Sequence, residues 1–235
     1  MFNVTIPKNK LVAFPDFERS PYSQQLVIGQ PFNILKRFQY LGVNKNTGVF
    51  EMADIDGKPT SDITQATANA LVNLQPKFYG GIQNSFELRG VQLDFLFQFV
   101  KQIGANYYAN GVAGKFLSGS GNQPVSILQR WQKEGDITNV QKFSQNTTLN
   151  NSIIMANFST HAYTDASYIR LKNIALSYQF DAQCVKQIGL QGLRVYAHAQ
   201  NLATITGYEG LDPETRSSAS LPPLRIVTIG FLASF

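Results

Sequence analysis

Few side chains in this sequence have the types and spacing that catalysis or metal binding requires. The histidines are His161 and His198, far apart in the chain, and a metal or catalytic site needs several convergent ligands. Asp54, Asp56 and Asp62 are acids that could bind calcium, but their spacing lacks the EF-hand pattern and turn chemistry explains them. We therefore predict no catalytic residue, no metal and no cofactor.

The remaining chemical motifs are also missing from the sequence. Cys184 is the single cysteine, which excludes an internal disulfide and a multi-cysteine metal site. No serine sits in a nucleophile elbow, and no glycine-rich phosphate loop follows a strand into a helix. The sequence predicts a protein that is not an enzyme.

Aromatic residues in predicted loops are the better candidates for contact with a ligand. Such rings stack on sugars or contact another protein, and packing within the loops is the alternative role. The candidates are Tyr107, Tyr108, Trp131, Tyr163 and Tyr208.

Composition points to a sheet with two different surroundings. Charged residues make up 15% of the chain, against about 25% in ordinary domains, and Gly, Asn, Gln, Ser and Thr are frequent. This balance suits a wall between lipid and a wet lumen, and it also suits a secreted β-sandwich. The net charge of +5 comes from scattered residues without a basic run, so we expect no nucleic-acid partner.

The positions of apolar residues predict strands. No apolar run is long enough for a transmembrane helix, and MFNVTIPKNK is not a signal peptide, so an exported protein would need its signal upstream. In Pro223–Phe235, apolar residues occupy alternate positions through Val227, Ile229, Phe231 and Ala233. A period of two is typical of a strand with one apolar face.

The same alternation recurs along the chain and predicts about seven antiparallel strands. They are 1–6, 25–43, 77–89, 91–99, 167–180, 192–204 and 223–235, with short helices at Asp62–Leu74 and Val125–Trp131. The long loops 44–76, 102–165 and 205–222 would lie at one end, and the turns 89–90 and 181–190 at the other. The connection 7–24 would lie at the end with the short turns, and it is longer than the turns expected there.

The apolar face of these strands is richer than an ordinary exposed hairpin carries. We predict that it contacts lipid through Phe86, Phe95, Phe97, Phe99 and Phe231. About seven strands cannot close a membrane barrel, and an open edge in lipid leaves unpaired amides. The fold class is therefore all-β: the C-terminal antiparallel strands of a large transmembrane β-barrel, unless the face packs inside a sandwich.

Several phrases of the sequence resemble the SusC/RagA class of TonB-dependent outer-membrane transporters. They are PKFYGGIQNSFELRGVQLDFLFQF, ASYIRLKNIALSYQF, LRVYAHAQNLATITGYEGLDPE and LPPLRIVTIGFLASF, joined by NVTIPKNKLVAFPDFERSPYSQQLVIGQP and GVNKNTGVF. The likeness spans nearly the whole chain, and the RLKN…LSY and QNL…GYEGLDPE phrases are fairly specific.

The resemblance implies a barrel of about 22 strands around a plug, of which residues 1–235 would be the C-terminal part, without the plug and the N-terminal strands. It implies uptake of oligosaccharides or peptides across the outer membrane of a Gram-negative, Bacteroidota-like cell. A SusD-like surface lipoprotein and, through the missing N-terminal part, the TonB complex would be partners. Phe235 would be the barrel-assembly signal. The alternative function is a secreted glycan-binding β-sandwich.

Overall fold

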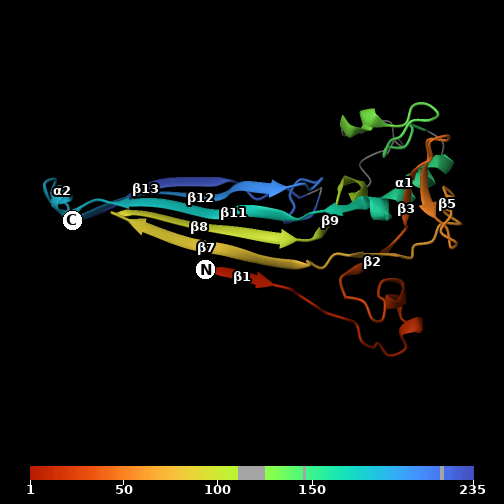
Figure 1. Ribbon diagram of the computed structural model, residues 1–235, viewed down its shortest axis with the longest axis horizontal. Coiled ribbons are helices and arrows are strands. Elements are labelled where there is room, and N and C mark those ends of the chain that lie inside the picture. The colour runs from red at the N-terminus through yellow and green to blue at the C-terminus, as the bar shows by residue number, and fades with distance from the viewer. Residues whose placement is uncertain (111–124, 145–146, 218–219) are drawn as a thin grey trace.

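Six antiparallel strands form one large sheet in the computed structural model, which describes residues 1–110, 125–144, 147–217 and 220–235. In sheet order they are β1 (Phe2–Thr5), β7 (Phe78–Leu88), β8 (Val91–Lys101), β11 (Tyr168–Gln179), β12 (Gly192–Thr206) and β13 (Ile226–Ser234). The sheet is long and narrow, with the irregular segments gathered at one end and the C-terminus at the other (Figure 1).

The tight turn between β7 and β8 follows from local backbone chemistry. Arg89 and Gly90 both have positive φ, at 48° and 83°, as a two-residue type I′ hairpin requires. A Cβ on Gly90 would lie 2.6 Å from the carbonyl oxygen of Gln179, so a side chain there would collide with backbone. The hairpin predicted at this point is confirmed.

A second region, which we call the loop layer, consists of residues 7–77, 103–166 and 207–225 as far as they are described. Its strands make three small sheets: β2 (Ile34–Arg37) with β6 (Ala70–Asn73), β3 (Tyr40–Val43) with β4 (Phe50–Ala53) and β5 (Pro59–Thr60), and β9 (Ile103–Ala105) with β10 (Tyr163–Asp165). It also holds α1 (Thr147–Asn157) and 3₁₀ turns at Phe17–Arg19, Pro21–Gln24, Tyr107–Asn110, Val125–Gln129 and Thr160–Ala162.

The buried hydrophobic core of the described residues lies in the loop layer. Phe50 and Met52 of β4 pack there with Ile153 and Met155 of α1 and with Tyr108. Helix α1 forms in an Asn- and Thr-rich stretch that carries no strong helical period, because its apolar side meets this core. The helix was therefore not predictable from periodicity.

Three expected elements are corrected by the structure. Residues 25–43 do not form a strand of the large sheet, which has six strands instead of about seven; they contribute β2 and β3 to the small sheets. Residues Asp62–Leu74 are not a helix, since the Asp62 carboxylate accepts hydrogen bonds from Thr64 in a turn and β6 follows. The expected helix at Val125–Trp131 is a 3₁₀ turn.

The absence of 25–43 from the large sheet explains the length of the connection that begins at residue 7. With 25–43 outside the large sheet, β1 runs to β7 through one connection, and every long connection of the sheet lies at the loop-layer end. The hairpin turn at Arg89–Gly90 and the short α2 (Ala182–Lys186) lie at the other end, near the C-terminus (Figure 1). Long loops on one rim and short turns on the other are typical of outer-membrane barrels.

Helices offer no route across a membrane in the described part of the chain, where none is both long and apolar enough to span one.

Candidate functional site

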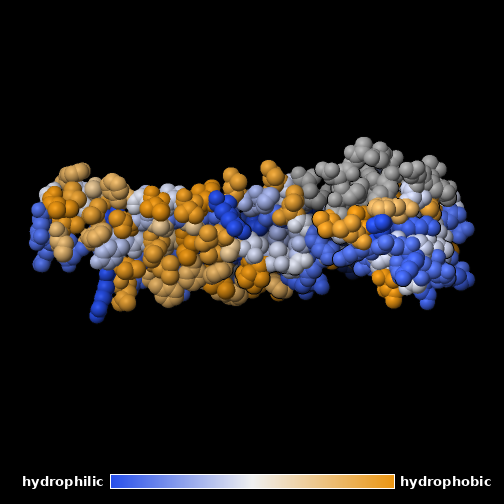
Figure 2. Space-filling model, turned by 90° about the horizontal axis from the view of Figure 1, so that it is seen from above, coloured by the Kyte–Doolittle hydropathy of each residue, from blue (hydrophilic) through white to orange (hydrophobic). Residues whose placement is uncertain are grey.

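One face of the large sheet is apolar over all six strands. The register places Phe97 between Ile82 and Leu171, and Phe231 beside Val195. The residues of this apolar face include Phe2, Val4, Phe86, Leu93, Phe95, Phe99, Ile169, Ile174, Leu176, Ala197, Val227 and Ile229. Figure 2 shows hydrophobic atoms gathered along the length of the sheet.

This apolar face has no protein cover among the described residues. Phe86 is 53% exposed, Phe231 is 73% exposed and Ile229 is 80% exposed, whereas large contiguous apolar patches are rare on soluble monomers. The strands β1 and β13 are the two edges of the sheet and each pairs on one side only. The five phenylalanines expected to face lipid share this face; their contact with lipid stays a prediction.

The opposite, polar face carries a buried ion cluster close to the loop layer. The Arg170 guanidinium of β11 donates hydrogen bonds to Asp212, to Glu214 (2.6 Å, Nη1 to Oε2) and to Thr204 (2.9 Å, Nε to Oγ1). Its side chain is only 2% exposed and that of Asp212 4%. Lys172 joins through 2.8 Å contacts from Nζ to both Glu214 oxygens.

The geometry of this cluster depends on a β-bulge and on a turn. The register of β11 shifts between Leu171 and Asn173 on both sides, which leaves Lys172 unpaired as the bulged residue. The Asp212 carboxylate also accepts from the backbone N–H groups of Glu214 and Thr215, at 2.9 and 3.2 Å. The RLKN and GLDPE phrases, on which the family resemblance rested, therefore meet in space and fasten 207–225 to β11.

His161 lies inside the loop layer among aromatic rings. Its ring centroid is 4.2 Å from those of both Tyr40 and Tyr108, and burial lowers its pKa to about 4. Burial also raises the pKa of the Tyr40 and Tyr108 phenols. The imidazole is therefore neutral at pH 7 and serves packing.

The five aromatic candidates divide between packed and accessible positions. Tyr108 belongs to the buried core, and Tyr208 is 9% exposed with its hydroxyl donating to the Ala105 carbonyl; the burial of both favours the packing role. Tyr107 stacks on Tyr108 at 4.8 Å. Trp131 donates from Nε1 to the Lys45 carbonyl (3.0 Å). Tyr163 accepts from Arg37 Nε (2.9 Å) and lines a pocket.

The other residues singled out from the sequence do not come together. Asp54 accepts from the N–H groups of Asp56 and Lys58, as turn chemistry requires. His198 is on the polar face opposite Thr228, and Cys184 is an exposed free thiol in α2. No group of three or more His, Cys, Asp or Glu side chains in the described ranges is arranged to hold a metal ion.

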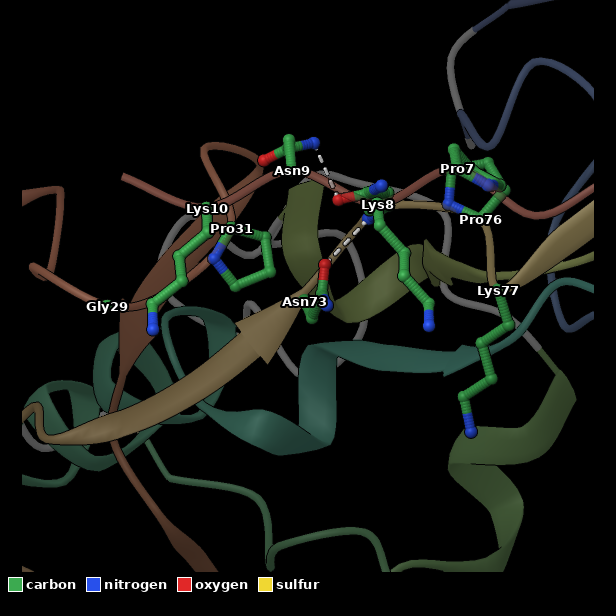
Figure 3. A pocket seen from close by; sticks show the side chains of 10 residues that line it. Pro7, Lys8, Asn9, Lys10, Gly29, Pro31, Asn73, Pro76 and Lys77 are labelled. Carbon is green, nitrogen blue, oxygen red and sulfur yellow. Dashed lines mark hydrogen bonds between the residues drawn. The ribbon is translucent and has the colours of Figure 1, made fainter. Parts of the chain in front are cut away.

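Two adjoining pockets open where the large sheet meets the loop layer. The first, about 560 Å³, is lined by Pro7, Lys8, Asn9, Lys10, Gly29, Pro31, Asn73, Gln75, Pro76 and Lys77 (Figure 3). The second, about 530 Å³, shares Asn73, Gln75 and Lys77 with it and extends to Lys101 and Asp165. Sequence reasoning missed both, because their residues come from segments far apart in the chain.

Comparison with known proteins relates the chain to one group of receptors. No family model matches it. It is 26% identical over 239 aligned positions to TonB-dependent receptor P3 of Formosa agariphila, covering 91% of this chain and 23% of that protein. It is 28% identical over 141 positions to TonB-dependent receptor P39 of the same organism, covering 58% of this chain and 13% of that one.

Solved structures of the RagAB peptide importer have the same fold in part of one chain. The open-open state matches with a TM-score of 0.77 and 23% identity, covering 100% of this chain and 26% of that chain. Another RagAB structure matches with a TM-score of 0.62 and 26% identity, covering 87% and 23%.

The chain is therefore homologous to TonB-dependent receptors and has the fold of part of a RagAB chain, and it spans less than a quarter of the length of the curated relatives it matches. The resemblance noted in the sequence is confirmed. So is the expectation that the chain is not an enzyme, because the homologues are receptors and transporters. The mostly antiparallel β fold is confirmed as well, although the strands do not close a barrel in this structure.

Proposed function

We propose that this chain forms the C-terminal wall strands and outward loops of a TonB-dependent importer in the outer membrane of a Gram-negative, Bacteroidota-like cell. The observation that carries the proposal is the uncovered apolar face of a sheet with two open edges. Lipid would cover the face, and further strands would pair with the edges, since unpaired backbone is costly in hydrocarbon.

The arrangement of connections supports the same orientation. The β7–β8 hairpin turn and α2 would lie at the periplasmic rim. The loop layer would face outward, and it has a hydrophobic core of its own. A SusD-like surface lipoprotein would dock over the loop layer, and TonB would act through a part of the protein outside this chain. Phe235, 85% exposed beyond the end of β13, would be the assembly signal.

The substrate class proposed is the oligopeptide. The support is the likeness to a chain of a peptide importer; an oligosaccharide remains the second candidate from the family resemblance. The glycan-binding sandwich finds less support, because no second sheet covers the apolar face in the described residues.

Two neighbouring residues of β13 offer a matched test of the lipid contact. Ile229 is on the apolar face and Thr228 is opposite His198 on the polar face. In the full-length protein with Cys184→Ser, a fluorophore on Ile229→Cys should be quenched by lipids with nitroxide-labelled chains, and one on Thr228→Cys should not. Equal quenching at both positions would contradict a membrane wall.

A further inference from the structure

We infer that the first pocket at the sheet–loop junction binds carboxylate side chains of acidic oligopeptides. This inference rests on the proposed importer function and names the chemistry of its cargo. Lys8, Lys10 and Lys77 line the pocket, and the described residues of its lining include no Asp or Glu. Within the described residues, none of these three ammonium groups forms an ion pair.

The pocket is built from segments that hydrogen bonds hold together. Asn9 donates from Nδ2 to Gln75 Oε1 (2.8 Å), and its Oδ1 accepts from the Phe32 N–H (2.7 Å). Asn9 thereby joins the segments 7–10, 31–32 and 73–77. Lys10 runs across Gly29, where a Cβ would lie 3.8 Å from Lys10 Cε. The lysine stems therefore start from fixed points.

The three ammonium groups belong to side chains that line one pocket. In Figure 3 the Lys8 and Lys77 side chains lie near each other on one side of Asn73, and the Lys10 side chain ends beside Gly29 at the other end of the pocket. Like charges that share a cleft repel one another and focus a positive potential in it. A ligand carboxylate relieves that repulsion and gains charge-assisted hydrogen bonds, so the pocket selects for anions.

Lys77, the pocket residue that adjoins the large sheet, is on the polar side. Phe78 shares the apolar face with Phe2 and Val4, and Lys77 precedes it by one residue, on the other side of the strand. In the proposed importer this side faces the lumen, at the outward rim. The pocket therefore lies on the path of cargo and away from lipid.

The lining favours a peptide over a sugar acid. No aromatic ring is among the described residues that line the first pocket, and sugar recognition draws on stacking against such rings. The pocket instead offers the amides of Asn73 and Gln75, which match peptide backbone groups, and the flat rings of Pro7, Pro31 and Pro76. Its volume of about 560 Å³ lies within the usual range of ligand pockets, about 300–1,000 Å³.

The test measures binding of two labelled pentapeptides to the detergent-purified full-length protein, one rich in Glu and its twin with Gln in place of each Glu. The wild type should prefer the Glu peptide by about tenfold or more. The variant Lys8→Gln/Lys10→Gln/Lys77→Gln should lose that preference and keep its affinity for the Gln peptide.

A variant with the same loss of charge is the control. Lys45→Gln/Lys58→Gln/Lys133→Gln removes exposed lysines of the loop layer that do not line this pocket, and it should keep the preference. Raising NaCl from about 50 to about 300 mM should weaken wild-type binding of the Glu peptide and spare the Gln twin. If the pocket variant fails to fold, this salt comparison tests whether charge attraction drives the binding of the Glu peptide.

The inference is overturned if the two peptides bind equally, if neither binds, if the pocket variant keeps the preference or if the control loses it. A uronic-acid oligosaccharide that binds more tightly than the Glu peptide would overturn the peptide assignment. Failure of the importer itself is seen separately: the lipid-quenching pair at Ile229 and Thr228 would then give equal signals.

Discussion

The large sheet and the loop layer use apolar residues in opposite ways. In the loop layer, Phe50 and Met52 are 1% and 0% exposed and pack against α1. In the sheet, Phe231 and Ile229 are largely exposed, although the alternation that produces them is as regular as in any core strand. The loop layer thus supplies its own nonpolar surroundings, and the sheet requires them from outside.

The polar face of the sheet is intermediate between these two regions. It holds few buried groups except at its junction with the loop layer, where Arg170 of β11 pairs with Asp212 of the loop layer. The comparison shows that buried side chains are concentrated where the loops fold back on one another. The strands of the large sheet have a regular alternation of apolar and polar residues, but most of their apolar side chains are not buried. Mutations should therefore have different effects in the three places.

The largest effect is expected at the junction. Arg170→Met removes the cationic partner of a buried carboxylate, Asp212, and should destabilise the folded protein by about 3–5 kcal/mol. Thermal unfolding in detergent measures the loss. Lys58→Met breaks an ion pair whose side chains are 76% and 68% exposed and should cost about 1 kcal/mol or less.

A core substitution in the loop layer should follow. Met52→Ala empties a fully buried position and should cost about 2–5 kcal/mol. Hydrogen exchange should show the opening confined to the loop layer, with the protection of β8 and β11 unchanged. Ile55→Ala, at a side chain 75% exposed, is the control; an equal cost would mean that the core assigned here is not the stabilising one.

The faces of the sheet offer the next test. Phe97→Arg should cost about 2–4 kcal/mol in folding into lipid vesicles if the apolar face meets hydrocarbon. Gln83→Arg, on the polar face of the neighbouring strand, should cost far less. Gln98 is a poorer control because it pairs with Arg170. Similar costs at 97 and 83 would remove the distinction between the faces.

The smallest expected effect is a pH dependence of the loop layer. The pKa of His161 falls from 6.5 to about 4 on folding, so the unfolded chain binds more protons between these values. Stability should therefore decrease as the pH falls from about 6.5 to about 4, by up to about 3 kcal/mol. His161→Phe should flatten this slope in urea unfolding; an unchanged slope would assign it to other groups.

The sequence predicted the sheet better than the loop layer for a physical reason. Strand alternation is a local signal, so β7, β8, β11, β12 and β13 could be located from it, with the hairpin at Arg89–Gly90. The loop layer depends on contacts between distant segments. Residues 25–43 alternate like a wall strand, but β2 pairs with β6, a partner that no local pattern indicates.

The candidate sites follow the same division. Phe97 and Phe231 could be assigned to a face by counting residues. The burial of Tyr108 and Tyr208 could not be predicted, because it depends on α1 and on the Ala105 carbonyl. The Arg170 cluster was present in the sequence as two phrases. The signal that could have predicted their contact was the opposite charge of the two phrases: Arg170 and Lys172 lie in a strand, and Asp212 and Glu214 lie in a loop.

The attachment of Asp212 and Glu214 to β11 has a consequence for how the large sheet is assembled. Between Thr206 and Ile226 the chain must return before β13 can pair with β12. Once the carboxylates are held by Arg170 and Lys172, the return is divided into two shorter spans, and each span loses less entropy on closing. The last strand then begins its search for register already close to its neighbour.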